Sequence, residues 1–279
     1  MFEIFEDALM DSLKLIPFLF VTYVIMGIIE RQTGDKMAKI IKNSRTVGPL
    51  WGSLLGVVPQ CGFSTMASNF YAGRIITLGT LIAIYLSTSD EMLPIMISEN
   101  VPVSTMLSIL GMKAAIGLIT GFIIDGIIRW RKGVQEFSDE DVIHEEEHGN
   151  LFVHAGIHTL KITAFIFVIA FVLNWIISIM GEERLGEFLT DVPVVGELVA
   201  GLVGLIPNCS ASVVITQLFL KGIIGVGPMM SGLLVSAGVG LLVLVKENKN
   251  HAENAKIVAI LYGTGVLWGI LIDLLGVTI

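Results

Sequence analysis

The feature that most constrains this chain is a motif that occurs twice, 148 residues apart. Residues 56–64 read GVVPQCGFS and residues 204–212 read GLIPNCSAS. Each copy has an apolar run that stops at Pro, then an amide side chain, a Cys and, three residues after the Cys, a Ser. The same offset pairs three further positions without a gap, Gly117, Gly121 and Asp125 with Gly265, Gly269 and Asp273. Two halves that carry the same interrupted polar segment are typical of transporters built from internal repeats.

The composition indicates that most of the chain lies in lipid. Of its 279 residues, 54% are hydrophobic and 15% are charged, whereas about a quarter of the residues in a soluble domain are charged. The apolar segments are long enough to cross a hydrocarbon layer of ~30 Å. The first residues are acidic and no small-residue cleavage site follows them, so we expect no secretory signal. We therefore predict an all-α polytopic membrane protein.

The loops of the two halves have opposite charge bias. The loop at residues 31–45 is basic, whereas its equivalent at residues 181–191 is acidic. The loop at residues 98–103 has no Lys or Arg, whereas its equivalent at residues 246–256 is basic. Because Lys and Arg gather on the cytoplasmic side of membrane spans, this pattern predicts two inverted-topology repeats in the cell (inner or plasma) membrane, with the N-terminus outside.

The repeats and the segment between them divide the chain into three parts. We predict a first inverted repeat at residues 1–132, an acidic, His-containing cytoplasmic linker at residues 133–153 and a second inverted repeat at residues 154–279. Inversion requires an odd number of membrane crossings in each repeat. Five crossings would meet this requirement, and so would three crossings with a re-entrant helical hairpin at the motif. The arms around each motif Pro have roughly a dozen residues, ~18 Å as helix, which favours hairpins whose tips meet near the midplane.

The motif predicts a binding site made by the start of a helix. Pro ends the first arm, and the unpaired amides of the second arm then point at the tip with the positive end of the helix dipole. The Cys, the Ser and a later hydroxyl fall on one helical face. Small polar residues also pack membrane helices closely, but packing does not require Pro, an amide and the only two cysteines to coincide twice. The candidate substrate-binding residues are Gln60, Cys61, Ser64, Ser68 and Asn69 and, in the second copy, Asn208, Cys209, Ser212, Thr216 and Gln217.

Acidic residues also occur within or near apolar segments. Asp90 and Glu91 follow Ser87-Thr88-Ser89, which looks like a helix interruption, as does Ser236-Ala237-Gly238 in the second half. A carboxylate inside a span is costly and tends to mark an ion or proton pathway, so both acids are candidates for the coupling ion or proton. The alternative is that the span ends early and both lie at the outer surface. Asp125 and Asp273 lie near span ends, and we expect them to anchor the interface.

Four histidines in and after the linker have metal-ligand spacing. His144 and His148 are four residues apart, and so are His154 and His158. On a helix each pair would face one way and could hold a regulatory metal. The alternative is a solvated acidic linker with scattered His.

The two motif copies, with a His- and acid-rich loop between them, make the chain resemble a bacterial family of ten-helix heavy-metal exporters related to arsenical permeases. Its members are also labelled arsenic efflux proteins or manganese transporters. The resemblance implies a membrane transporter and no enzyme. The broader permeases are similar in using membrane-embedded cysteines, although this chain has one Cys in each half instead of an adjacent group.

Ligand softness orders the alternatives for the substrate. Thiolates suit trivalent arsenic and thiophilic metals, so Cys61 and Cys209 as metal ligands favour a thiophilic metalloid or heavy-metal species. Manganese prefers carboxylates and would need Asp90 and Glu91. A small anion or organic acid could be held by the helix N-termini, and a membrane dithiol–disulfide enzyme is the alternative of another class. The expected partners are the lipid bilayer and a small inorganic or organometallic substrate. We expect no cofactor and no nucleic acid, and a homo-oligomer is an open alternative to a monomer.

Overall fold

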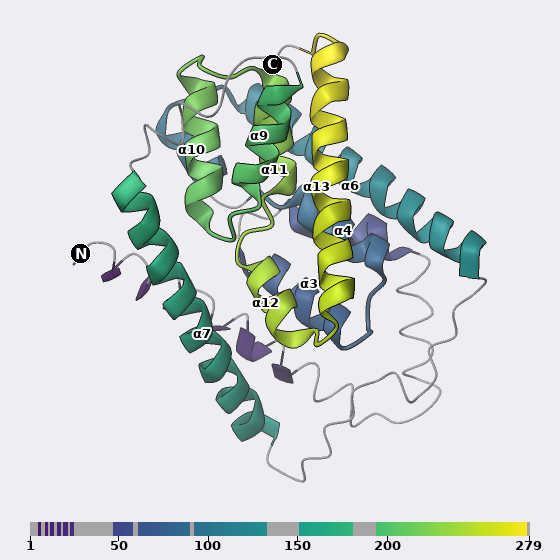
Figure 1. Cartoon of the computed structure of the whole chain (residues 1–279), viewed down its shortest axis with the longest axis vertical. Helices are drawn as coiled ribbons and strands as arrows, with labels where there is room; N and C mark the ends of the chain where they lie inside the picture. The colour runs from purple at the N-terminus through teal and green to yellow at the C-terminus, as the bar shows by residue number, and fades with distance from the viewer. Residues whose placement is uncertain are drawn as a thin grey trace.

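A computed structural model describes most of the chain. The described residues are 5, 6, 9, 10, 12, 13, 16, 17, 19–21, 23, 24, 47–57, 61–89, 92–132, 151–180 and 194–277. These residues form helices and the turns that join them, and none of them lies in a strand (Figure 1). The predicted all-α class is confirmed.

The helices of the first half form a series of short and long segments. Residues 47–56 are helical, and α3 (Cys61–Ala72), α4 (Leu78–Ser87), α5 (Met92–Ser98) and α6 (Val103–Lys132) follow. The long helix α7 (Leu151–Met180) comes next and lies along one side of the other helices (Figure 1). It packs through Ile162 and Ile166.

The second half repeats this series at the offset of the motif. It contains α9 (Val195–Gly204), α10 (Cys209–Leu220), α11 (Val226–Val235), α12 (Gly240–Glu247) and α13 (His251–Leu274). Both ends of α10 and α11 lie 148 residues after the ends of α3 and α4, and α12 and α13 begin 148 residues after α5 and α6. The helix bounds therefore follow the same offset as the sequence motif. Whether the halves cross the membrane in opposite directions stays a prediction.

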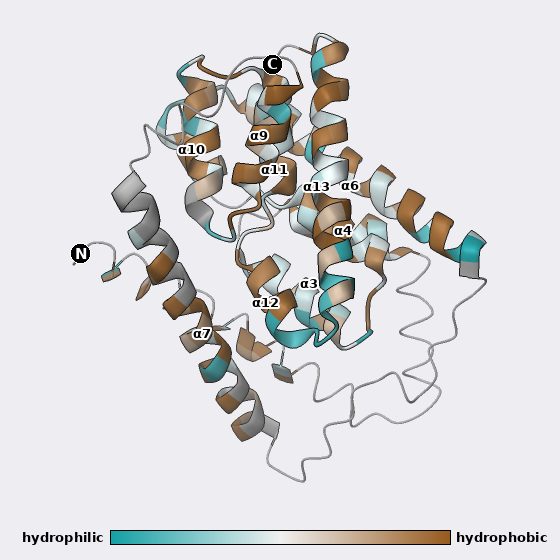
Figure 2. Cartoon of the chain, viewed as in Figure 1, coloured by the Kyte–Doolittle hydropathy of each residue, from teal (hydrophilic) through white to brown (hydrophobic). Residues whose placement is uncertain are grey.

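Four segments of the described chain are long and apolar enough to cross a membrane. They are Leu78–Ser98, Val103–Arg131, Val226–Glu247 and His251–Leu274. The apolar residues along two of them can be followed on α6 and α13 (Figure 2). The first and third are broken near the middle, between α4 and α5 and between α11 and α12, so both predicted interruptions are confirmed. By contrast, α9 and α10 have 10 and 12 residues, or ~15–18 Å. These lengths fit the predicted short arms, although hairpins and full crossings stay alternatives.

The centre of the molecule is formed by α4 and α11, in which all residues after the first are buried. Paired glycines allow this packing. A Cβ on Gly121 of α6 would lie 2.7 Å from the carbonyl oxygen of Gly79, and one on Gly269 of α13 would lie 2.9 Å from that of Gly227. Glycine thus lets helix backbones approach closely at equivalent places in both halves.

Two residues at equivalent positions also contact each other. Trp268 Nε1 donates a hydrogen bond to Thr120 Oγ1 at 3.0 Å, and the two residues are 148 apart. Equivalent positions can touch only close to an axis that relates the halves. The contact therefore supports a two-fold relation between them.

The paired aspartates differ in their surroundings. Asp273 is exposed, as expected for an anchor at the interface. Asp125 is buried, and its carboxylate accepts hydrogen bonds from the backbone N–H of Gly79 at 2.9 Å and from the Thr77 hydroxyl at 2.7 Å. It satisfies a free N–H at the start of α4, where a negative charge is favourable. Asp125 therefore caps a helix, and its position at the membrane interface stays a prediction.

Candidate functional site

Both motif copies place their Cys at the start of a helix. The helix before the first copy ends at residue 56 and α3 begins at Cys61; α9 ends at Gly204 and α10 begins at Cys209. Asn208 precedes α10 in an extended conformation, and its side chain makes no hydrogen bond that caps the helix. The predicted break at each motif is therefore present. Gln60 and the side chains of both cysteines lie outside the described part of the structure, so their role as ligands stays a prediction.

The polar face of α3 lies against the break in the second half. Ser64 and Ser68 are fully buried. The Ser68 hydroxyl lies 2.7 Å from the carbonyl oxygens of Ser64 and Gly240 and 2.7 Å from the Tyr85 hydroxyl. Gly240 is the first residue of α12, directly after the break between α11 and α12. One motif copy thus packs against the interrupted span of the other half.

Glycine is required at this contact. A Cβ on Gly240 would lie 2.8 Å from the Cβ and 2.9 Å from the carbonyl carbon of Ser64. Distances below 3.0 Å to backbone require the helices to move apart. The equivalent of Gly240 is Met92, the first residue of α5. The glycine that allows α3 and α12 to approach closely therefore has no equivalent at the start of α5.

The polar face of α10 is also buried but makes different contacts. Ser212 and Thr216 are 3% and 0% exposed. The Thr216 hydroxyl donates to the carbonyl oxygen of Ser212 at 2.7 Å, within its own helix. Gln217 is half-buried. The predicted polar face is therefore present and buried on both helices. On α3 its last hydroxyl, that of Ser68, bonds to the other half, whereas on α10 the Thr216 hydroxyl bonds within its own helix.

Asn69 is the candidate residue with the clearest unused hydrogen-bonding capacity. Its side chain is buried and lies near the Tyr23 hydroxyl, but neither its amide nitrogen nor its oxygen has a hydrogen bond of good geometry among the described residues. Most buried polar groups are paired, and an unpaired one costs about 1–3 kcal/mol. A bound polar species would recover this energy. Asn69 therefore fits a binding role.

The break between α4 and α5 is joined to the first motif copy. The Ser89 hydroxyl donates to the carbonyl oxygen of Val57, two residues before the motif Pro, at 2.8 Å. The hydroxyl groups of Ser87 and Thr88 bond to carbonyl oxygens of the preceding turn of α4. The seryl and threonyl side chains thus satisfy backbone groups where the helix stops. Asp90 and Glu91 lie outside the described residues, so their coupling role stays a prediction.

Lys113 is a buried charged residue that the sequence analysis did not select. It lies in α6, is 1% exposed, and its Nζ donates to the carbonyl oxygens of Thr88 and Leu233. Its sequence signal was available, because it is the only charged residue between Glu99 and Asp125, and charges inside membrane spans are usually functional. It has no charged counterpart, since Leu261 stands at the equivalent position.

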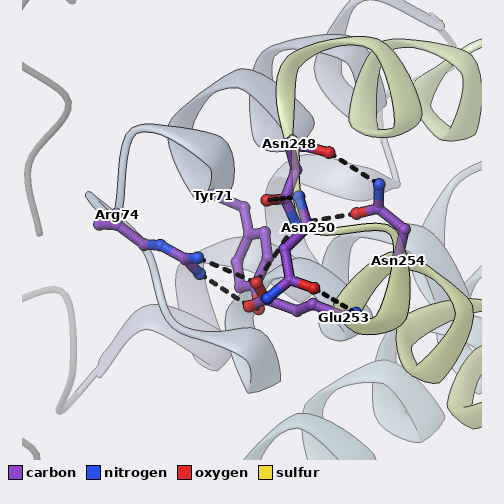
Figure 3. Close-up of polar contacts among 6 residues, drawn as sticks. All are labelled: Tyr71, Arg74, Asn248, Asn250, Glu253 and Asn254. Atoms are coloured by element: carbon purple, nitrogen blue, oxygen red, sulfur yellow. Dashed lines mark hydrogen bonds and ion pairs between the residues drawn. The ribbon is translucent and has the colours of Figure 1, made fainter.

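An ion pair joins the halves at the end of α3. The Arg74 guanidinium binds the Glu253 carboxylate through two parallel hydrogen bonds of 2.7 and 2.9 Å (Figure 3). The Tyr71 hydroxyl also donates to Glu253. Hydrogen bonding to Glu253 raises the pKa of Arg74, so the guanidinium stays charged. Bidentate pairs of this kind are among the stronger side-chain interactions.

The backbone around this pair is also specialised. Arg74 has a positive φ of 59°, and Gly222, its equivalent in the second half, has a φ of 69°. Only glycine adopts this conformation without cost. On the other side of the pair, three asparagines order the start of α13 through hydrogen bonds to one another and to the first helical turn, namely Asn248, Asn250 and Asn254 (Figure 3).

The predicted histidine site falls largely outside the described residues. His144 and His148 are not described, and of His154 and His158 only the backbone, in α7, is described. Among the side chains that the structure does describe, no group of three or more His, Cys, Asp or Glu could hold a metal ion. A regulatory metal site at the histidines therefore stays a prediction.

Apolar spans with breaks in their middle, arranged around a buried polar centre, define a multi-pass membrane protein of the transporter type. The chain belongs to the family described as "Putative, 10TM heavy-metal exporter", whose model matches residues 2–159. The matched part contains the first motif copy, Lys113 and the linker. The predicted family is confirmed. No curated protein and no solved structure matches the chain.

Proposed function

We propose that the protein transports a thiophilic metalloid or heavy-metal species that binds between the two motif copies. One observation carries the proposal. Cys61 and Cys209 are each the first residue of a helix that follows a break, at equivalent positions in the two halves. The start of a helix favours negative charge, and it therefore favours the thiolate, the form of Cys that binds soft metals.

The surroundings of the two helix starts support a binding site. Ser64, Asn69, Ser212 and Thr216 are buried on α3 and α10. Gln60, Ser68, Asn208 and Gln217 complete the proposed set. Inverted repeats around such a site would expose it alternately to the two sides of the membrane by moving one half against the other.

The proposed topology has its own test. We propose that residues 1–132 and 154–279 insert in opposite directions, with the linker at residues 133–153 in the cytoplasm. Reporter enzymes fused at residues 98–103 and 246–256 should then report opposite sides of the cell membrane. The same side for both loops would contradict inversion.

Substitution of the cysteines tests the transport mechanism. In vesicles that contain purified protein, Cys61→Ser and Cys209→Ser should each remove most of the transport of a trivalent arsenical, because a hydroxyl is a hard ligand that does not replace a thiolate. Ser108→Ala is a matched control, since Ser108 is exposed on α6 and bonds to the carbonyl oxygen of Ser104. A double Cys→Ser protein that transports the arsenical at the wild-type rate would contradict the proposal.

A small anion is the second candidate substrate. It is favoured by the extended backbone of Asn208 before α10, where the side chain of Asn208 does not cap the helix, because helix starts bind anions. If this reading holds, Cys→Ser changes should be nearly silent, whereas Ser64→Ala and Ser212→Ala should impair transport. The same vesicles, loaded with a small oxyanion in place of the arsenical, decide between the two.

The acidic residues after the first break are proposed to couple transport to protons or to bind a divalent metal. If Asp90 carries a proton, Asp90→Asn should abolish the dependence of transport on a pH gradient and leave binding largely intact. If Asp90 and Glu91 instead bind manganese, Asp90→Asn should abolish the binding of manganese itself. Unchanged proton dependence and unchanged metal binding would place both acids at the outer surface.

A further inference from the structure

Lys113 lies where the broken helices of the two halves meet. It belongs to the span Val103–Arg131, and its side chain is buried. Its ammonium donates to the carbonyl oxygen of Thr88 in the first half and, at 2.7 Å, to that of Leu233 in the second half. An ammonium is costly to bury unless hydrogen-bond acceptors replace its water. Two acceptors of this ammonium are backbone carbonyl groups, one from each half.

Both carbonyl groups belong to interrupted helix ends. Thr88 directly follows the last residue of α4, and Leu233 lies in the last turn of α11. The last carbonyl groups of a helix have no partner within that helix, and they form the negative end of its dipole. Because α4 and α11 are equivalent helices, two equivalent negative ends converge on one positive charge.

Helix ends of this kind bind small cations in transporters with discontinuous helices, where unwound carbonyl groups coordinate the coupling ion. We propose that the backbone carbonyls at the ends of α4 and α11 form a monovalent-cation site, and that its occupant in this chain is the Lys113 ammonium. The cation is thus tethered to α6. The site needs no free sodium or potassium ion, and it uses none of the residues proposed to bind the thiophilic substrate.

The asymmetry of the position agrees with a single cation for the pair of helix ends. The equivalent of Lys113 is Leu261, which is fully buried in α13. Because one ammonium contacts both helix ends, no second cation is needed at the position of Leu261. Leu261 also supplies a control, because its truncation would open an apolar cavity and remove no hydrogen bond from a carbonyl group.

Thermal unfolding of the purified protein tests the proposal without any transported substrate. Lys113→Ala should lower the unfolding midpoint by about 5 °C or more. Methylammonium, and to a lesser extent ammonium or potassium, should raise the midpoint of this variant again in a saturable manner, because a ligand that binds the folded state stabilises it. Choline, which is too large for the site, controls for ionic strength. The wild-type midpoint should be the same in all of these chlorides.

Two further variants separate a cation site from simple loss of packing. Leu261→Ala should also unfold at a lower temperature, but no cation should restore it. Lys113→Met, which fills the space without a charge, should be destabilised and not restored either. If methylammonium and choline have the same effect on Lys113→Ala, the proposal is wrong. It is also wrong if methylammonium restores Leu261→Ala as well as it restores Lys113→Ala.

A third variant serves if Lys113→Ala does not yield folded protein. Lys113→Gln keeps a donor for one carbonyl group and leaves the other open, so its midpoint should rise with methylammonium and not with choline. Equal effects of the two salts on Lys113→Gln would overturn the site. These outcomes do not depend on Cys61 or Cys209, so a failure of the cation site would not contradict the proposed transport of a thiophilic species.

Discussion

The two halves share their helix bounds but differ in the polar contacts that join them. α10 and α11 lie at the offset of 148 from α3 and α4. At four linking positions, however, the residues differ in kind: Arg74, Tyr85, Met92 and Lys113 correspond to Gly222, Leu233, Gly240 and Leu261. The helical frame is therefore duplicated, whereas the links between the halves are one-sided. One-sided links stabilise one arrangement of the two halves over the arrangement in which the halves exchange their conformations. This difference in stability gives a two-state equilibrium a preferred state.

The largest effect is expected where the one-sided contact is closest. In Gly240→Ala the new Cβ would lie 2.9 Å from the carbonyl carbon of Ser64, so α3 and α12 must move apart. Overpacking of this kind costs about 1–3 kcal/mol, and we expect the upper end of this range, because the shift also lengthens the hydrogen bond of the Ser68 hydroxyl to the Gly240 carbonyl group. The measurement is the free energy of unfolding in detergent.

The control for this change is Gly263→Ala. A Cβ on Gly263, in the middle of α13, meets nothing within 4 Å, and alanine in a helix is more stable than glycine by about 0.8–1.0 kcal/mol. It should therefore leave the stability unchanged or raise it. Equal effects of the two substitutions would show that α3 and α12 are not in close contact.

A pair of equivalent hydroxyl groups gives the next effect. The Ser68 hydroxyl links Tyr85 and the Gly240 carbonyl group across the halves, whereas the Thr216 hydroxyl bonds within its own helix. Ser68→Ala should cost about 1–3 kcal/mol, because it leaves buried groups with fewer partners. Thr216→Ala should cost less, since its acceptor already belongs to the helix. A larger cost for Thr216→Ala would reverse the comparison.

Sequence reasoning predicted the elements that occur twice. The motif offset, the helix starts at Cys61 and Cys209 and both interruptions could be read from the sequence, because Pro, Gly and runs of small polar residues act on the local backbone. The buried faces of α3 and α10 also followed, since helical spacing determines which residues share a face. These features depend on neighbours within a few residues of the chain.

The one-sided contacts could not be predicted in this way. Lys113, Tyr85 and Arg74 have no similar residue at the equivalent position, and each acts through a group far away in the sequence. The hydrogen bond between Lys113 and Leu233 spans 120 residues, and that between Arg74 and Glu253 spans 179. Which distant groups meet is decided by packing of the helices, and spacing along one helix does not contain that information.

The ion pair between Arg74 and Glu253 should give a smaller, unequal pair of effects. Both side chains are about one quarter exposed, at 24% and 22%, so the bidentate pair should contribute about 1–1.5 kcal/mol, between exposed and buried values. Glu253→Gln should lose most of this. Arg74→Gly should lose less, because glycine also removes the cost of the positive φ at this position. Unfolding free energies at low and high salt measure both, and a larger loss for Arg74→Gly would show that the backbone carries no strain.

The smallest effect is expected at Gly222, the equivalent of Arg74. Its φ of 69° requires the left-handed region, yet a Cβ there would meet nothing within 4 Å. Gly222→Ala should therefore cost about 1 kcal/mol from the backbone alone, and Gly222→Asn should cost less, because asparagine tolerates this conformation better. Gly222→Arg should cost as much as Gly222→Ala, because the position equivalent to Glu253 is Thr105, which offers no carboxylate. If Gly222→Arg were instead as stable as the wild-type protein, the second half would supply an acidic partner of its own, and the links between the halves would not be one-sided.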